Sequence, residues 1–196
     1  MSWPQTPIAL EPSTGGGTCI GEGALREADI IVSTTRAGVS TTIRIGTGSV
    51  ISHAALYAGN GQVIEAIGEG VVRRPIEQSL AEDSLAVAYR SPNASPPIAA
   101  RIVAYAAAQA RAHAAYSVVG AVLSTDSVMC RIVGPRPASF YCSQLVLESY
   151  RRGGLPLSTA PSQCLTPQDL VVIAQHQLRY VGHLLGRATW FPVLSP

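Results

Sequence analysis

A cysteine at the start of a predicted helix is the first place in this chain where chemistry is to be expected. Cys142 opens the run Cys142–Arg152 (CSQLVLESYRR), which has a helical composition and is followed by Gly153-Gly154. The positive end of the helix dipole and the free N–H groups at a helix start favour a thiolate, the nucleophilic form of cysteine. Cys142 is therefore a candidate nucleophile. The alternative is that it packs as a small apolar side chain.

A thiolate nucleophile needs a base, and the base needs a group that orients it. His53 and Glu65 are candidates, because they lie in two β-prone runs on either side of Gly59-Asn60-Gly61, the strongest hairpin signal in the chain. If the loop consists of these three residues, Ala55 pairs with Glu65, and His53 lies diagonally across from that carboxylate on the same face. A two-residue Asn60-Gly61 loop would instead place the two side chains on opposite faces.

Both residues also have plainer explanations. His53 could be a structural histidine with satisfied hydrogen bonds. Glu65 could lie on an edge strand with its carboxylate in water, although a carboxylate buried within Val-Ile-Glu-Ala-Ile would need a partner. The other histidines (His113, His176 and His183) have no spacing that suggests a metal pair.

The cysteines indicate neither a zinc site nor a disulfide framework, because no CxxC spacing occurs among them. They are Cys19, Cys130, Cys142 and Cys164. We expect all four to be thiols, and we expect no metal and no cofactor.

The elements that must position these residues follow from apolar patterns and turn signals. Strands are predicted at 28–33, 52–58, 62–67, 71–76, 85–90 and 178–184, with a turn at Glu82-Asp83, and helices at 98–115, 142–152 and 167–174. Residues 37–49 are ambiguous, and 120–139 are predicted to be irregular. A Pro- and Gly-rich flexible arm over 1–23 precedes a single domain over 24–196. This order of elements indicates an α+β domain rather than repeated βαβ units.

Composition limits the possible classes of protein. The chain has 196 residues, of which 47% are hydrophobic and only 13% charged, so it can bury the core of one domain and wholesale disorder is excluded. A net charge of +2 with scattered arginines gives no basic stripe, so we do not expect a nucleic-acid partner. We recognise no secretory signal and no apolar run of about 20 residues that would predict a transmembrane segment, so the cytoplasm is the default compartment.

Four segments carry a resemblance when they are taken in order: Ser-His-Ala-Ala-Leu-Tyr (52–57), Val-Ile-Glu-Ala (63–66), Ala-Tyr-Ser-Val-Val-Gly (115–120) and Phe-Tyr-Cys-Ser-Gln-Leu-Val (140–146). Together with Ala-Asp-Ile-Ile-Val (28–32) and the lead-in at 47–52, they resemble the permuted NlpC-type, papain-like cysteine hydrolases. The resemblance implies that Cys142 is the nucleophile, His53 the base and Glu65 the orienting group. It also implies support of the substrate or the oxyanion by Tyr116, Tyr141 and Ser143.

The same resemblance implies a fold and an activity. The fold would be an antiparallel, barrel-like sheet packed on the Cys142 helix and on the alanine-rich helix predicted at 98–115. The activity would be amide hydrolysis through a Cys142 thioester, in small peptides or in the peptide stems of bacterial peptidoglycan. Export without a cleaved signal would make the chain a secreted antibacterial effector with an immunity protein as partner.

Two alternatives stay open. A lecithin:retinol-acyltransferase-like lipid acyltransferase or thiol lipase shares the permuted order and the thiol chemistry. A non-catalytic binding module would keep the fold alone. The intact set of Cys142, His53 and Glu65 argues against the binding module, because a degenerate copy would be free to lose any of them.

Overall fold

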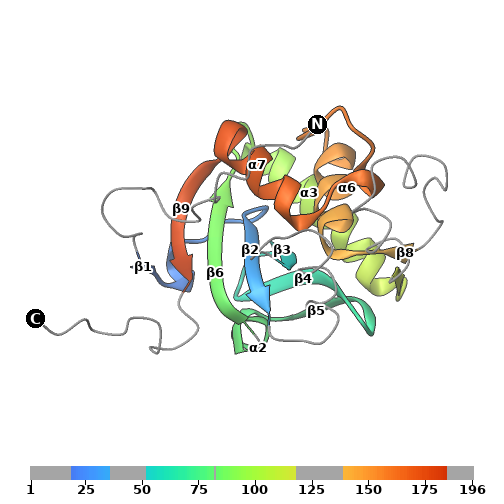
Figure 1. Ribbon diagram of the computed structural model, residues 1–196, viewed down its shortest axis with the longest axis horizontal. Coiled ribbons are helices and arrows are strands. Elements are labelled where there is room, and N and C mark those ends of the chain that lie inside the picture. Colours follow the sequence, from blue (N-terminus) through green and yellow to red (C-terminus); the bar gives the residue numbers. More distant parts are fainter. Residues whose placement is uncertain (1–18, 36–51, 82, 118–138, 185–196) are drawn as a thin grey trace, which may run out of the picture.

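A seven-stranded sheet with helices against it forms the body of the protein (Figure 1). The structure is a computed structural model that describes residues 19–35, 52–81, 83–117 and 139–184. Across the sheet the strands follow the order β1-β9-β6-β2-β3-β4-β5. Their bounds are β1 Cys19–Ile20, β2 Ile30–Thr35, β3 His53–Tyr57, β4 Gln62–Ile67, β5 Gly70–Pro75, β6 Asp83–Arg90 and β9 Arg179–Leu184. The predictions for residues 1–18, 37–49 and 120–138 lie outside the described residues.

The sheet is mixed and open, which corrects the expected antiparallel barrel. Its neighbouring strands are antiparallel except for β1, which runs parallel to β9. β1 and β5 lie at opposite edges and do not pair with each other. At the β5 edge the Val71 N–H is satisfied from outside the sheet, since it donates to the Ala114 carbonyl oxygen at 2.8 Å. Since β1 falls within 1–23, the end of the predicted arm belongs to the sheet.

Three helices lie on one face of this sheet: α3 (Pro96–Arg111), α6 (Cys142–Arg152) and α7 (Pro167–Gln177) (Figure 1). Successive side chains of a strand point to opposite faces of the sheet, so the strand residues alternate between two apolar clusters. Ala54 and Leu56 pack with the three helices, whereas Ala55 packs on the other face. Across the described ranges, no helix has the length and apolar character that a membrane span requires.

A fourth helix, α2 (Ile76–Ala81), was not predicted. The sequence indicated only a turn between the strands that flank it. Six residues are too few to form a stable helix by themselves, so α2 depends on tertiary packing. Ile76 supplies that packing, since it is buried in the apolar cluster on the face opposite α3, α6 and α7.

The ends of the predicted helices follow local sequence signals. α6 starts at Cys142 and ends before Gly153, as predicted. α7 begins after Thr166, whose hydroxyl accepts from the Asp169 N–H in a capping box. α3 and α6 pack closely, because a Cβ at Gly153 would lie 2.3 Å from Cγ1 of Ile102. The close approach of α3 and α6 therefore depends on the absence of a side chain at Gly153.

Candidate active site

The β3–β4 hairpin has the register that the triad hypothesis requires. Ala55 pairs with Glu65, and the Ala58 N–H donates to the Gln62 carbonyl oxygen at 2.8 Å. The loop is therefore Gly59-Asn60-Gly61, with φ of 81°, 51° and 68°. Glycine and asparagine tolerate this left-handed region better than other residues. Of the two loops that the sequence left open, the structure has the three-residue one, in which His53 and Glu65 share a face.

This register brings His53 and Glu65 into direct contact. Nε2 of His53 lies 2.5 Å from Oε2 of Glu65, with both side chains buried. Glu65 is fully buried and has two further partners: Ser79 of α2 donates to Oε2 at 3.1 Å, and Arg74 of β5 donates from Nε to Oε1. Burial alone would raise the pKa of Glu65, but its bonds and its attraction to His53 and Arg74 lower that pKa to about 2. Glu65 is therefore a carboxylate at neutral pH.

Cys142, the first residue of α6, is the third candidate catalytic side chain. Its side chain is buried, and Sγ lies 4.0 Å from the carbonyl oxygen of Ser52, the residue before His53. Burial lowers the pKa of His53, but hydrogen bonds to Cys142 and Glu65, together with their charges, raise it well above 6.5. Because Glu65 occupies Nε2, Nδ1 is the ring nitrogen left for the thiol. The structure therefore brings the three candidate catalytic side chains together.

The three predicted supporting residues have different surroundings. Tyr116 lies in the short strand β7 (Ala115–Tyr116), which pairs with β8 (Ser139–Phe140), and its ring packs against Tyr141. Burial, followed by the nearby charge of Cys142, raises the pKa of Tyr116, so its hydroxyl stays protonated. Tyr116 thus packs against the residue that directly precedes the candidate nucleophile.

Tyr141 and Ser143 flank Cys142 in sequence, but their hydroxyls point to backbone. Tyr141 donates to the Ser162 carbonyl oxygen at 3.1 Å, and Ser143 donates to the Leu165 carbonyl oxygen at 2.8 Å. These bonds tie the start of α6 to the segment that holds the short helix η2 (Ser162–Cys164). Both hydroxyls therefore fix the position of Cys142.

Sequence reasoning missed Arg74 and Ser79. One signal for Arg74 was available, because a carboxylate inside an apolar strand needs a partner. Arg74 pairs with Val63, two residues before Glu65, so it shares a face with that carboxylate. No comparable signal existed for Ser79, since its helix was itself not predicted.

One cysteine departs from expectation. Cys19 and Cys142 are free, but Cys164 is disulfide-bonded, and its partner is not among the described residues. The expectation of four thiols is therefore wrong. Within the described residues, no cluster of three or more histidine, cysteine, aspartate or glutamate side chains could hold a metal ion.

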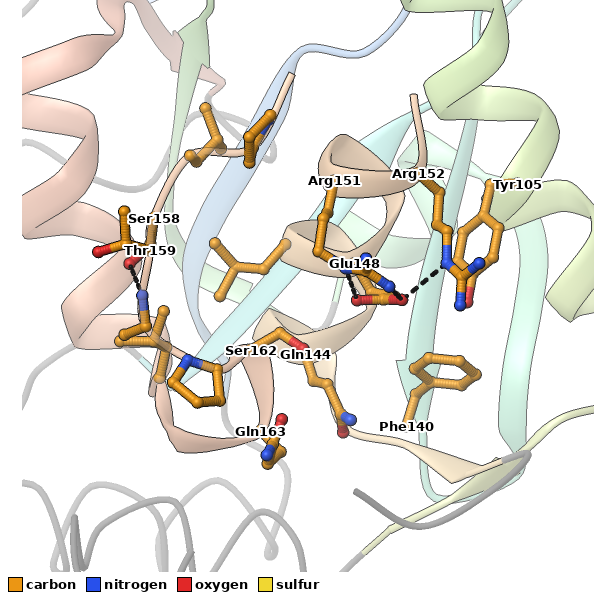
Figure 2. Close-up of a pocket in the computed structure, with 16 residues that line it drawn as sticks. Tyr105, Phe140, Gln144, Glu148, Arg151, Arg152, Ser158, Thr159, Ser162 and Gln163 are labelled. Atoms are coloured by element: carbon orange, nitrogen blue, oxygen red, sulfur yellow. Dashed lines mark hydrogen bonds and ion pairs between the residues drawn. The ribbon is translucent and has the colours of Figure 1, made fainter. Parts of the chain in front are cut away.

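A groove of about 490 Å³ lies between α6 and residues 156–165 (Figure 2). Its α6 wall is formed by Gln144, Leu147, Glu148 and Arg151, at the spacing of one helix face. In Figure 2 the ion pairs of Glu148 with Arg151 and Arg152 lie along this wall. Cys142 is not among the lining residues, because it lies on the other face of α6.

The fold and the site together define the class of permuted papain-like proteins, in which the histidine of the sheet precedes the cysteine of the helix. The chain belongs to the family described as permuted papain-like amidase enzyme, YaeF/YiiX, C92 family, whose profile matches residues 24–166. The family resemblance found in the sequence is therefore confirmed.

Two Escherichia coli proteins are similar to this chain, one in sequence and one in fold. The chain is 26% identical to the probable lipoprotein peptidase YaeF of strain K12, over 82% of this chain and 71% of YaeF. It is similar in fold to the crystal structure of the metalloprotein YiiX of O157:H7, with a TM-score of 0.56 and 20% identity, over 80% of this chain and 96% of YiiX. The likeness to YiiX confirms the α+β, permuted papain-like fold.

Proposed function

We propose that this chain is a cysteine amidase or peptidase that cleaves an amide bond through a thioester on Cys142. The observation that carries the proposal is that His53 contacts Glu65 at 2.5 Å, while Cys142 opens α6 with its Sγ 4.0 Å from the carbonyl oxygen of Ser52, the residue before His53. A nucleophile, a base and an orienting carboxylate are the parts that acyl transfer needs.

The proposed reaction has two halves. The Cys142 thiolate attacks the carbonyl carbon, and the His53 imidazolium gives its proton to the leaving amine as the C–N bond breaks. Neutral His53 then takes a proton from water, whose oxygen attacks the thioester, and the sulfur leaves as a thiolate. The Cys142 N–H has no acceptor within the helix, so it is a suitable donor to the oxyanion.

For the substrate we propose small peptides or the stem peptides of peptidoglycan. The family description as amidases supports an amide over an ester. The name of the relative YaeF as a probable lipoprotein peptidase likewise supports a peptide bond.

We also propose that the protein acts outside the cytoplasm, as a secreted antibacterial effector with an immunity protein as partner. The disulfide at Cys164 supports an oxidising compartment, because disulfides are rare in the cytosol. An expression test addresses this: the chain directed to the periplasm of a test bacterium should be toxic, and Cys142→Ala should remove that toxicity. Equal toxicity of both forms would contradict the proposal.

The decisive experiment is mass spectrometry of peptidoglycan fragments after incubation with the protein. Wild type should release cleaved stem peptides, and Cys142→Ala should release none. Cys19→Ala is the matched control, since Cys19 is free and exposed, and it should behave as wild type. Transfer of an acyl group from a phospholipid to Cys142 without peptide cleavage would favour the lipid acyltransferase. Binding without turnover would favour the non-catalytic module.

A further inference from the structure

Glu65 is held by groups on both of its carboxylate oxygens. Oε2 accepts from His53 and Ser79, and Oε1 accepts from Arg74. Arg74 is itself mostly buried, with 11% of its side chain exposed, and Glu65 has none. A buried ion pair between a guanidinium and a carboxylate is only weakly screened by water. Arg74 is therefore a fixed positive charge next to the group that orients His53.

Resting on the proposed function, we infer that Arg74 is a positioning residue that offsets the charge of Glu65, so that His53 can become the neutral base that thioester hydrolysis requires. The His53–Glu65 pair by itself would favour imidazolium at every stage. A lasting imidazolium suits the first half of the reaction but blocks the second.

The proton balance of the two halves gives the reason. Before acylation, the Cys142 thiolate and the Glu65 carboxylate both stabilise protonated His53. After acylation the sulfur is an uncharged thioester, and His53 has lost its proton to the leaving group. His53 must now stay neutral until it takes a proton from water. Glu65 still attracts a proton to His53 at this stage, and the Arg74 guanidinium weakens that attraction.

The charged groups that face His53 come from three elements. Glu65 belongs to β4 and Cys142 to α6, while Arg74 of β5 lies behind Glu65. Ser79 of α2 is uncharged, and so is Tyr116 of β7 at neutral pH. Arg74 is thus the positive charge within this set, and arginine cannot lose its proton in a protein.

A two-stage assay with p-nitrophenyl acetate separates the halves. The thiolate displaces p-nitrophenolate in a burst that reports acylation, and the steady rate reports hydrolysis of the acetyl thioester. For Arg74→Met we expect a burst of wild-type size. We also expect the acid limb of the pH–rate profile for thioester hydrolysis to move up by about one pH unit. Release of acetate is then roughly tenfold slower at pH values below that limb.

Two variants serve as controls. Arg74→Lys keeps the positive charge and should keep the limb near its wild-type position. Arg73→Met removes an exposed arginine from the opposite face of β5, so it should leave both halves unchanged. A merely structural role for Arg74 would reduce the burst and the steady rate together without moving the limb.

A measurement on the wild-type protein covers the case in which Arg74→Met does not fold. Methyl methanethiosulfonate converts Cys142 to an uncharged mixed disulfide, with methanesulfinate as the leaving group. NMR titration should then show His53 neutral at the pH where thioester hydrolysis by the wild type is fastest. A His53 that is still protonated at that pH would overturn the inference, because Arg74 would then not be offsetting Glu65.

The outcomes also separate this inference from the proposed function. Absence of a burst in wild type would contradict the proposed function, since Cys142 would not accept an acyl group. A wild-type burst on Cys142 combined with an unmoved limb in Arg74→Met would overturn the role of Arg74 alone.

Discussion

Nε2 of His53 and Oε2 of Glu65 are 2.5 Å apart across the β3–β4 hairpin, although the two residues are 12 positions apart in the chain. The contact exists because the three-residue loop sets a register that directs both side chains to one face. It fixes the histidine ring through one nitrogen and leaves the other for Cys142. The following predictions test what this pair does.

Cys142 should be the most reactive thiol of the folded protein toward iodoacetamide at mildly acidic pH. The reason is that Cys142 opens a helix and that Cys142 and Glu65 raise the pKa of His53, which favours a positively charged histidine beside the thiol. Alkylation followed by peptide mapping measures the rate at each cysteine. Faster alkylation of Cys19, which is exposed, would contradict the assignment. Cys142→Ala should abolish turnover with a nearly unchanged Tm.

The alkaline limb of kcat/KM should lie above pH 6.5. Acylation needs the imidazolium form of His53, and Glu65 and Cys142 raise the pKa of His53 above its ordinary value despite the opposing effect of burial. The ion pair therefore survives into the neutral range and is lost as the pH rises through that raised value. A pH profile on a cleaved peptide measures the limb. A midpoint at or below 6.5 would be inconsistent with the raised pKa of His53.

Glu65→Gln should lower the rate on the order of 10- to 1,000-fold, less than Cys142→Ala does. The amide keeps the shape of the side chain but removes the negative charge that favours imidazolium. NMR titration should accordingly show a lower pKa for His53 in the variant. Both quantities can be measured on one preparation. Full activity with an unchanged His53 pKa would make Glu65 a bystander.

Stability should fall in acid through Glu65. Its pKa is lowered from 4.5 to about 2 in the folded protein, mainly by His53 and Arg74 against the cost of burial. A depressed folded-state pKa stabilises the protein fully above 4.5, and this contribution is lost as the pH falls toward 2. The loss is on the order of 3 kcal/mol. Urea unfolding at several pH values measures it, with Glu65→Gln as the control that should lack this component.

Gly153→Ala should destabilise the fold by about 1–3 kcal/mol. The new Cβ would lie 2.3 Å from Cγ1 of Ile102, a fully buried side chain of α3 that has little room to move. Gly23→Ala is the matched control, since nothing lies within 4 Å of a Cβ at that position. Thermal unfolding of both variants measures the difference. Equal Tm values would show that α3 and α6 can separate without cost.

The sequence by itself determined the features that depend on neighbouring residues. Gly59-Asn60-Gly61 located the hairpin loop, since glycine and asparagine accept positive φ values, but the choice between a two-residue and a three-residue loop, and with it the register of His53 and Glu65, was settled only by the structure. The start of α6 at Cys142, its end before Gly153 and the capping of α7 by Thr166 were predictable for the same local reason.

The tertiary structure decided what depends on residues far apart in the chain. Arg74 meets Glu65 only because β5 pairs with β4, and Ser79 reaches it only because α2 forms against the sheet. Contacts between distant parts of the chain also decide three further features: the parallel pairing of β1 with β9, the open sheet and the disulfide at Cys164. Periodicity and turn chemistry report local conformation. The choice among distant partners is made by packing and by the cost of burying a charge without a counter-ion.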